Sequence, residues 1–402
     1  MSGAKKSAKP LRLTALFRDF LQSEKVSGIL LFTCTIISLL IANSSIGHTY
    51  TELWAYKTGV SLGPLDFHLS IADWINDGLM TIFFLMVGLE IERELYIGEL
   101  SDRKRALLPV IGALGGMIAP AFIYWGFNQG SATISGIGIP TATDIAFAIA
   151  IMGFVSKRVP LSIKVFLTAL AIIDDLGAIL VIALFYGHGF SVLYLGLAMA
   201  VLGVLFFLAR RGITNLWIYL PAGLLMWIFM MHSGIHATIT GVLLAFVIPF
   251  EKGTRTSVSY KLQHALHQPV AFIIIPLFAL ANTAILLNTD ILQELGNAES
   301  LGIFFGLLFG KPLGITLFAY GSVAIGITKF GKGVKFAHIF GAGMLAGIGF
   351  TMSIFITNLA FNEQSWIQLG KVSILLGSAA AAIFGLLFLR FFAPMPKKEP
   401  EI

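Results

Sequence analysis

Long apolar runs recur along almost the whole chain, and they constrain its fold more than any other feature. Twelve runs are apolar enough to cross a bilayer, at roughly 26–42, 71–89, 107–127, 134–154, 161–186, 192–209, 215–231, 234–250, 269–286, 301–325, 338–361 and 366–389. Only 12% of the 402 residues are charged, about half the share of a typical soluble domain. Since lipid offers backbone groups no hydrogen-bond partner, the sequence predicts an all-α, polytopic membrane protein of about twelve transmembrane helices.

The positive charges lie almost entirely on one side of this predicted topology. Twenty-four of the 27 Lys and Arg residues fall in the N-terminal segment or in alternate connections, and the other connections hold only Lys57. Such an asymmetry predicts that both termini are cytoplasmic. The Lys and Arg residues form short clusters between apolar runs, which indicates that they set the membrane orientation and do not bind a nucleic acid. We therefore expect a basic cytoplasmic segment over 1–25, a transmembrane domain over 26–390 and a cytoplasmic tail over 391–402.

Two adjacent carboxylates, Asp174 and Asp175, lie near the middle of the fifth span. An ionisable side chain within a span is costly enough that function is its default explanation. Neighbouring helix positions point about 100° apart, so the two side chains can share a water-filled cavity without facing one partner in the same way. We expect them to titrate as a coupled pair and to bind either protons or a hard cation. A structural polar pair is the alternative.

The fourth span carries helix-breaking residues next to a further carboxylate. Gly138 and Pro140 precede Thr143 and Asp144, so we expect an interrupted helix with freed backbone groups at mid-membrane. Asp144 would offset the positive charge of a freed helix N-terminus. The alternative is a proline kink satisfied by threonine side chains, with Asp144 in a salt bridge.

The eleventh span contains Gly343, Gly347 and Gly349, which favour a second interruption. This span would cross the membrane in the direction opposite to the fourth. A pair of interrupted spans in corresponding halves predicts a transport site between inverted repeats, here spans three to five and ten to twelve. Ordinary close packing of helices through glycine is the alternative.

A lysine, Lys311, precedes Pro312 within the tenth span. A buried ammonium group needs a carboxylate or carbonyl partner, and Asp174 or Asp175 is the natural candidate. Breaking and remaking that pair would couple proton movement to cation binding, whereas a static charge neutraliser is the alternative.

Four further ionisable residues carry weaker signals. Asp77 lies near the outer end of the second span, and Glu90 and Glu94 lie near its inner end. Carboxylates at helix ends are often only solvated or paired with a neighbour such as Arg93. His236 is a lone imidazole in an apolar segment, for which a hydrogen-bonded packing role is favoured over a proton relay.

Several strings resemble the NhaA sodium/proton antiporters, in family order from the second span to the eleventh. They are WINDGLMTIFFLMVGLEIEREL, TATDIAFAIA, LTALAIIDDLGAILVIALFY, SGIHATITG, PLFALANT, GKPLGI and GIGFTMSIFI. The resemblance implies a multi-pass protein of the bacterial inner membrane that exports sodium or lithium in exchange for a larger number of incoming protons. It implies activation at alkaline pH and no cofactor. It leaves a homodimer open.

The resemblance also assigns roles to the residues within the spans. Asp174 and Asp175 would carry the transported sodium and the protons, with Asp175 the principal sodium ligand. Thr143 and Asp144 would line the crossed, unwound segments, and Lys311 would neutralise the facing helix ends and pair with Asp174.

Asp77 and Glu90 would take supporting positions on the second span under the same resemblance. The family's pH response is attributed to a charged cluster at the cytoplasmic funnel. The matching residues here are Glu94, Gln263, His264 and His267.

Two residues of this funnel region depart from the family pattern. Gln263 stands where a glutamate is expected, and Glu92 stands where a basic residue is expected. Both changes spare the residues assigned to transport. We therefore expect intact exchange with an altered pH dependence.

Three other functions compete with this interpretation. A cation/proton exchanger with another cation preference or stoichiometry remains open. An intramembrane aspartyl protease needs two carboxylates on separate helices, whereas the strongest pair here is adjacent and the Gly-x-Gly-Asp string is absent. A passive sodium channel is disfavoured by the mid-membrane lysine and the inverted repeats. Without a nucleotide-binding loop, the sequence indicates a secondary transporter rather than an enzyme.

Overall fold

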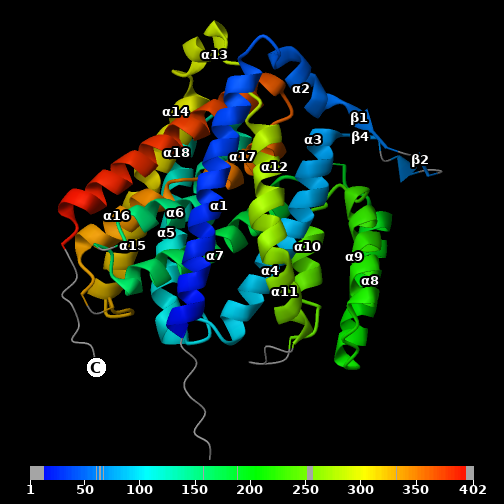
Figure 1. Cartoon of the computed structure of the whole chain (residues 1–402), viewed down its shortest axis with the longest axis horizontal. Helices are drawn as coiled ribbons and strands as arrows, with labels where there is room; N and C mark the ends of the chain where they lie inside the picture. The colour runs from blue at the N-terminus through cyan, green and yellow to red at the C-terminus, as the bar shows by residue number, and fades with distance from the viewer. Residues whose placement is uncertain are drawn as a thin grey trace, which may run out of the picture.

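The computed structural model describes residues 13–394 apart from 60, 63, 64, 67, 157, 188, 251–256 and 332. Its described part is a bundle of helices, most of which run between two ends of the molecule (Figure 1). Residues 1–12 and 395–402 of the predicted terminal segments lie outside the described residues.

Seven helical segments of the described chain are long and apolar enough to cross a membrane. Three of them contain a π-helical turn. The seven are α3–η1–α4 (Ile71–Asp73, Trp74–Leu79, Met80–Tyr96), α5 (Arg103–Asn128), α7 (Leu161–Phe185), α8 (Val192–Arg210), α11–η3–α12 (Val258–Pro269, Val270–Ile274, Ile275–Asn282), α14–η4–α15 (Ala298–Phe305, Gly306–Gly310, Lys311–Ala324) and α18 (Gln364–Phe392).

Three bent helix pairs raise the number of spans in the described residues to as many as ten. They are α1 (Leu13–Ala42) with α2 (Gly47–Ala55), the 3₁₀-helix η2 (Ala132–Thr141) with α6 (Ile145–Phe154), and α16 (Phe336–Ala346) with α17 (Phe350–Ala360). The all-α, polytopic fold predicted from the sequence is thus confirmed.

The predicted spans at 215–231 and 234–250 correspond to shorter helices. α9 (Leu216–Met231) has 16 residues and α10 (Ile239–Ala245) has seven. At about 1.5 Å per residue, α10 cannot cross a bilayer alone, so the run at 234–250 crosses only with non-helical backbone around it.

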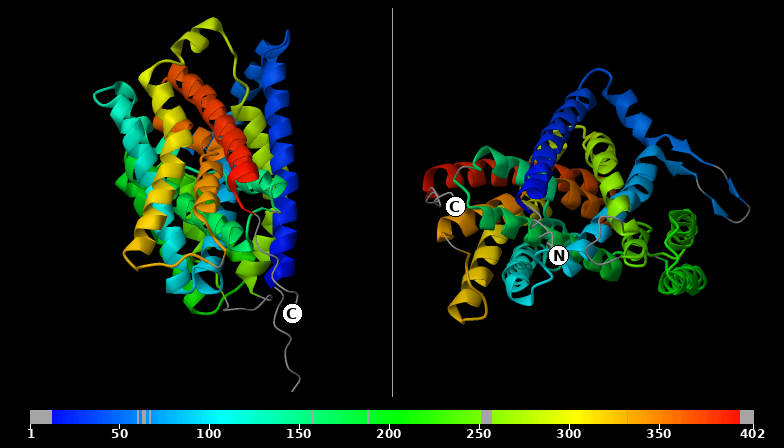
Figure 2. Two further views of the ribbon diagram at one scale, coloured as in Figure 1. Left: turned by 90° about the vertical axis from the view of Figure 1, so that its left-hand side faces the viewer. Right: turned by 60° about the horizontal axis from the view of Figure 1, so that its bottom comes forward.

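Few of the remaining described residues form regular structure. The segment 43–70, which lies between the first two predicted spans, contains α2 and two short antiparallel strand pairs. β1 (Lys57–Thr58) pairs with β4 (Leu69–Ser70), and β2 (Ser61–Leu62) pairs with β3 (Leu65–Asp66). These strands extend away from the helical bundle (Figures 1 and 2). The helix α13 (Thr289–Glu294) lies on the connection before α14.

The predicted clusters of positive charge define one end of the bundle. The connection from α4 to α5 lies at the end where α11 begins, at the bottom of Figure 1. Arg93 in the last turn of α4, Lys104 in the first turn of α5 and Lys261 in the first turn of α11 bring positive charge to this end. We call this the basic end. The helices α2, α3 and α13 lie at the opposite end.

Two sets of helices share the same order of a continuous span, a broken span and a continuous span. They are α5, η2–α6 and α7, and α14–α15, α16–α17 and α18; we call them together the repeat group. The first helices of the two sets touch through their backbones. A Cβ atom added to Gly314 would lie 2.0 Å from the Gly115 carbonyl oxygen, so these positions admit only glycine without a backbone shift.

The other spans, α1, α3–η1–α4, α8, α9, α10 and α11–η3–α12, form what we call the flanking group. Among them α8 and α9 pair at one edge of the bundle (Figure 1). The largest cluster of buried apolar side chains draws on both groups, so the two groups share one core.

Candidate ion-binding site

The two broken spans of the repeat group cross at their breaks. Both pairs bend by 46°, at 142–144 between η2 and α6 and at 347–349 between α16 and α17. The Asp144 amide donates to the Ile348 carbonyl at 2.7 Å, and the Thr143 hydroxyl donates to the Ala346 carbonyl at 2.8 Å. The two predicted interruptions are therefore confirmed, and their backbones are in direct contact.

The first break lies slightly later in the chain than predicted. Gly138 and Pro140 are part of η2, and the helical backbone stops only after Thr141. The tighter 3₁₀ form accommodates the proline, and the Thr141 hydroxyl donates to the Gly138 carbonyl at 2.8 Å. The unwound residues are thus 142–144, which include Thr143 and Asp144.

One carboxylate, that of Asp144, caps both helices that start at the breaks. Its Oδ1 accepts a hydrogen bond from the Phe147 amide at 3.0 Å, in the first turn of α6. Its Oδ2 accepts from the Thr351 amide at 3.2 Å and from the Thr351 hydroxyl at 2.5 Å, in the first turn of α17. The positive ends of two half-helices therefore meet one negative charge in a buried position.

Hydroxyl groups satisfy the carbonyls on the other side of each break. The Ser353 hydroxyl donates to the Ile139 carbonyl at 2.7 Å, and the Thr143 hydroxyl donates to the carbonyl of Ala346, the last residue of α16. Sequence reasoning missed Ser353 and Thr351, although both hydroxyl residues lie within four residues of Gly349, the last glycine of the second break. That position was the available signal.

The predicted lysine, Lys311, lies at the centre of the repeat group. Its ammonium group donates to Asp174 Oδ2 at 2.5 Å and to the Thr143 hydroxyl at 2.8 Å, and its side chain is fully buried. Lys311 directly follows the π-helical turn Gly306–Gly310. Because Pro312 has no amide hydrogen, the regular helical bond is lost there, and the widened turn sets where the lysine points.

The aspartate pair occupies the middle of α7, as predicted. Asp174 and Asp175 are buried, with 1% and 3% of their surface exposed. One oxygen of each, Oδ1, has no hydrogen-bond partner in the described structure. Buried carboxylate oxygens without partners are costly, so this site suits a proton or a cation bound by oxygen ligands.

A cavity of about 40 Å³ lies beside Asp175, on the side of the aspartate pair that faces the basic end. Its lining includes Glu90 from α4 and His267 from α11. This volume has room for at least one water molecule. Although most of the lining is apolar, Ser27, Glu90, Asp175 and His267 supply polar groups that such a water could bind.

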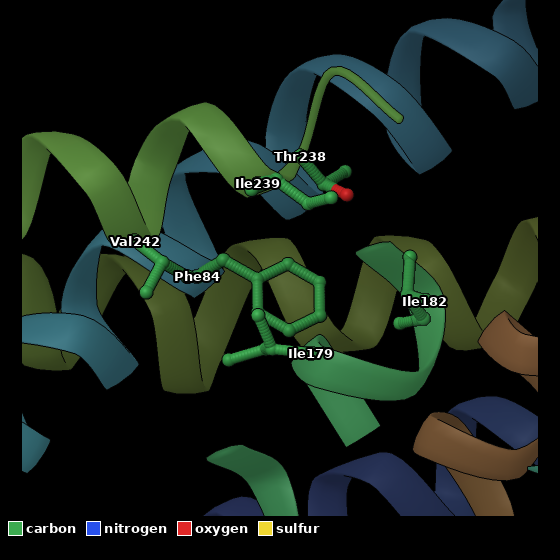
Figure 3. Close-up of a pocket in the computed structure, with 6 residues that line it drawn as sticks. All are labelled: Phe84, Ile179, Ile182, Thr238, Ile239 and Val242. Carbon is green, nitrogen blue, oxygen red and sulfur yellow. The ribbon is translucent and has the colours of Figure 1, made fainter. Parts of the chain in front are cut away.

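The opposite side of the aspartate pair is closed by apolar side chains. Ile179 and Ile182, one and two turns further along α7, pack against Phe84 of α4 (Figure 3). The small pocket between them has no room for a water molecule. The structure thus has a small cavity beside Asp175 toward the basic end and packed apolar side chains toward the opposite end.

Comparison with known proteins identifies the family of this chain. The sequence profile of the family described as Na+/H+ antiporter 1 matches residues 18–389. The chain belongs to this family. The chain is similar to the "Na(+)/H(+) antiporter NhaA" of Cytophaga hutchinsonii, with 54% identity over 97% of this chain and 98% of the relative.

Proteins of the same name from two other organisms are also similar to this member of the antiporter family. The relative from Flavobacterium psychrophilum is 52% identical over 95% of this chain and 97% of its own length. The relative from Vibrio cholerae is 46% identical over 96% of this chain and its full length. The resemblance to NhaA seen in the sequence is confirmed.

The predicted pH-response region of this antiporter lies where α4 and α11 meet. Arg93 contacts Glu94 at 2.9 Å and Glu90 at 3.5 Å. Glu92, one of the two departures from the family pattern, is buried, and its carboxylate accepts a hydrogen bond from Ser259 of α11 at 3.3 Å. Gln263 is half-buried on α11, so both departures lie on the helices of this contact.

The remaining predicted residues lie farther from the site. His264 is exposed, and its ring stacks on Tyr260. Asp77 lies in η1 toward the opposite end, where its backbone carbonyl accepts from Trp227 Nε1 at 3.2 Å. The imidazole of His236 lies 2.6 Å from the Tyr186 carbonyl oxygen, as a packing role requires.

The buried pair of Lys311 and Asp174 predicts a specific pattern of stability. Lys311→Met leaves an unpaired carboxylate in the core and should lower the free energy of unfolding by about 3–5 kcal/mol. Adding Asp174→Asn should restore part of the loss, because the double variant buries no isolated charge. Thermal unfolding of the purified protein in detergent measures both effects.

The exposed Lys261, in the first turn of α11, provides the control. Lys261→Met should shift the melting temperature little. Equal melting temperatures for Lys311→Met and Lys261→Met would contradict the importance of the pair.

Proposed function

We propose that the chain exchanges sodium or lithium for protons, and that the two compete at Asp174 and Asp175. The observation that carries this proposal is the aspartate pair itself. It is buried, each residue keeps one carboxylate oxygen without a partner, and a cavity large enough for water lies beside Asp175. A site of this kind holds either protons or one hard cation, but not both.

The charges of the site account for the competition. Asp144, Asp174 and Asp175 contribute three carboxylates, and Lys311 contributes one ammonium group close to them. The Asp144 carboxylate caps two helix N-termini, and Lys311 forms an ion pair with Asp174. Asp175 is left as the ligand that needs either a proton or a cation, which makes it the principal binding residue.

The crossed breaks support alternating access. Their half-helices are joined through short unwound segments, and hydrogen bonds between them satisfy the freed backbone groups. Such a crossing can tilt as a unit against its surroundings without exposing unsatisfied backbone to lipid. A tilt that closes the cavity at the basic end and opens the apolar seal at Phe84 would present Asp175 to the other side.

The orientation follows from the charge asymmetry. The basic end is assigned to the cytoplasm and both termini with it, in the inner membrane of a bacterium. The cavity beside Asp175 then lies on the cytoplasmic side of the aspartate pair. On the family pattern more protons enter than sodium ions leave, so the membrane potential drives export.

Liposomes containing a trapped pH dye test this proposal. With a proton gradient imposed, sodium or lithium should collapse the gradient in the parent protein, whereas Asp175→Asn should not respond because its amide can neither lose a proton nor supply charge to a cation. Asp102→Asn, an exposed helix cap on α5, is the matched control and should behave as the parent. A parental rate in Asp175→Asn, or no proton movement with either ion at any pH, would refute the proposal.

The same assay across pH tests the departure at Gln263. Gln263→Glu should move the half-maximal rate to higher pH, by up to about one unit, because an added carboxylate favours protons on neighbouring groups. Gln129→Glu adds the same charge at the exposed end of α5 and should leave the profile unchanged. Superimposable profiles for both variants and the parent would exclude Gln263 as a determinant of the pH response.

A further inference from the structure

A single amide side chain links the two helix groups at the opposite end of the molecule. Asn282, the last residue of α12, is 3% exposed. Its Oδ1 accepts from Asn358 Nδ2 at 2.7 Å and from Lys371 Nζ at 3.2 Å. Its Nδ2 donates to Asn76 Oδ1 at 2.8 Å and to the Phe278 carbonyl at 3.1 Å. We call Asn76, Asn282, Asn358 and Lys371 the amide cluster.

The amide of Asn282 is fully used in this arrangement. A primary amide has two hydrogens to donate and two lone pairs to accept with, and all four are engaged. Lys371 can only donate, so the oxygen of Asn282 must face it, and the orientation of the amide is determined by chemistry. Any displacement of one partner would therefore leave part of a buried amide unsatisfied.

The cluster joins elements of different groups. Asn76 and Asn282 belong to the flanking group, in η1 and α12. Asn358 and Lys371 belong to the repeat group, near the ends of α17 and α18 that lie toward the opposite end of the bundle (Figure 1). A tilt of the crossed helices against the flanking group must therefore break or rebuild the hydrogen bonds to Asn282.

The environment of Lys371 lowers the cost of breaking these hydrogen bonds. Within the described residues it has no carboxylate partner at ion-pair distance, and a neutral amide oxygen is its hydrogen-bond acceptor. A partly buried ammonium group held by one amide is weakly compensated. Opening this region to water would solvate the lysine and offset the loss of the bond.

The amide cluster lies on the sealed side of the ion-binding site. On that side Phe84, Ile179 and Ile182 leave no room for water, whereas the cavity beside Asp175 lies toward the basic end. Resting on the proposed exchange function, we propose that Asn282 is a positioning residue of the outer gate. Its hydrogen bonds to Asn358 and Lys371 hold the opposite end closed, and their release accompanies opening of the site on that side.

Thiol labelling tests this assignment in the full-length chain. The only cysteine is removed as Cys34→Ser, and Ile182→Cys places a reporter in the apolar seal. Right-side-out vesicles are treated with a membrane-impermeant methanethiosulfonate reagent. Asn282→Ala should raise the labelling rate about tenfold, as expected when ordinary hydrogen bonds are lost from the closed state alone.

Asn128→Ala is the matched control. Asn128 is also a buried amide toward the same end, but it bonds to Tyr124, Thr133 and Ala298, which all lie in the repeat group. Its loss should leave the labelling rate unchanged. Asn358→Ala removes one hydrogen-bond donor to Asn282 and should raise the labelling rate. This variant tests the role of the hydrogen bonds if Asn282→Ala does not fold.

Two results would overturn the assignment. The first is an unchanged labelling rate in both Asn282→Ala and Asn358→Ala, and the second is an equal rise in Asn128→Ala. Sodium-driven proton movement by the parent chain is measured in parallel. A parent without exchange refutes the proposed function, whereas an exchanging parent with unchanged labelling refutes only the role of Asn282.

Discussion

Two helix interruptions in the middle of a bilayer are the constraint on which the rest of this structure depends. Each break frees amides and carbonyls where no water is available to satisfy them. The protein meets this demand by crossing the two breaks, so that the unwound residues of one serve the other. The Asp144 carboxylate accepts hydrogen bonds from amides at both helix N-termini, and the hydroxyls of Thr143 and Ser353 donate hydrogen bonds to the freed carbonyls.

This solution also sets the electrostatics of the site. Asp144 brings a negative charge into the core, and Asp174 with Asp175 adds two more, against the single positive charge of Lys311. Buried charge must be balanced, so the negative charge that Lys311 does not neutralise must be neutralised by whatever binds at the aspartate pair. A proton and a sodium ion both meet that demand. The side chains that satisfy the freed backbone groups at the breaks therefore also help to set the charge at the exchange site.

Much of the architecture could be predicted from the sequence. Each of the twelve predicted runs contains a helix of the described chain, although these helices make only seven to ten possible spans. The glycine and proline residues located both breaks to within a few positions. The pairing of Lys311 with one of the aspartates followed from the cost of a lone buried charge. These features are local, or depend on charge within lipid, and both kinds of signal are visible in one chain.

Other features depend on contacts that no local pattern reveals. The double role of Asp144 requires Thr351, a residue 207 positions away, to lie at hydrogen-bond distance. Asn282 falls within the string PLFALANT, but it carries no charge and lies at a helix end, so nothing in the sequence indicated its four hydrogen bonds. The shortness of α10 was hidden because an apolar run has the same composition whether its backbone is helical or not.

The central claim is that sodium and protons compete for one buried aspartate pair, and proton release on sodium binding tests it most directly. Purified protein in detergent and weak buffer receives sodium while the pH is recorded, without any membrane or gradient. The account predicts that sodium binding releases protons near neutral pH, that the release fades at strongly alkaline pH where the site is already deprotonated, and that Asp175→Asn releases none. Sodium binding without proton release at any pH would contradict it.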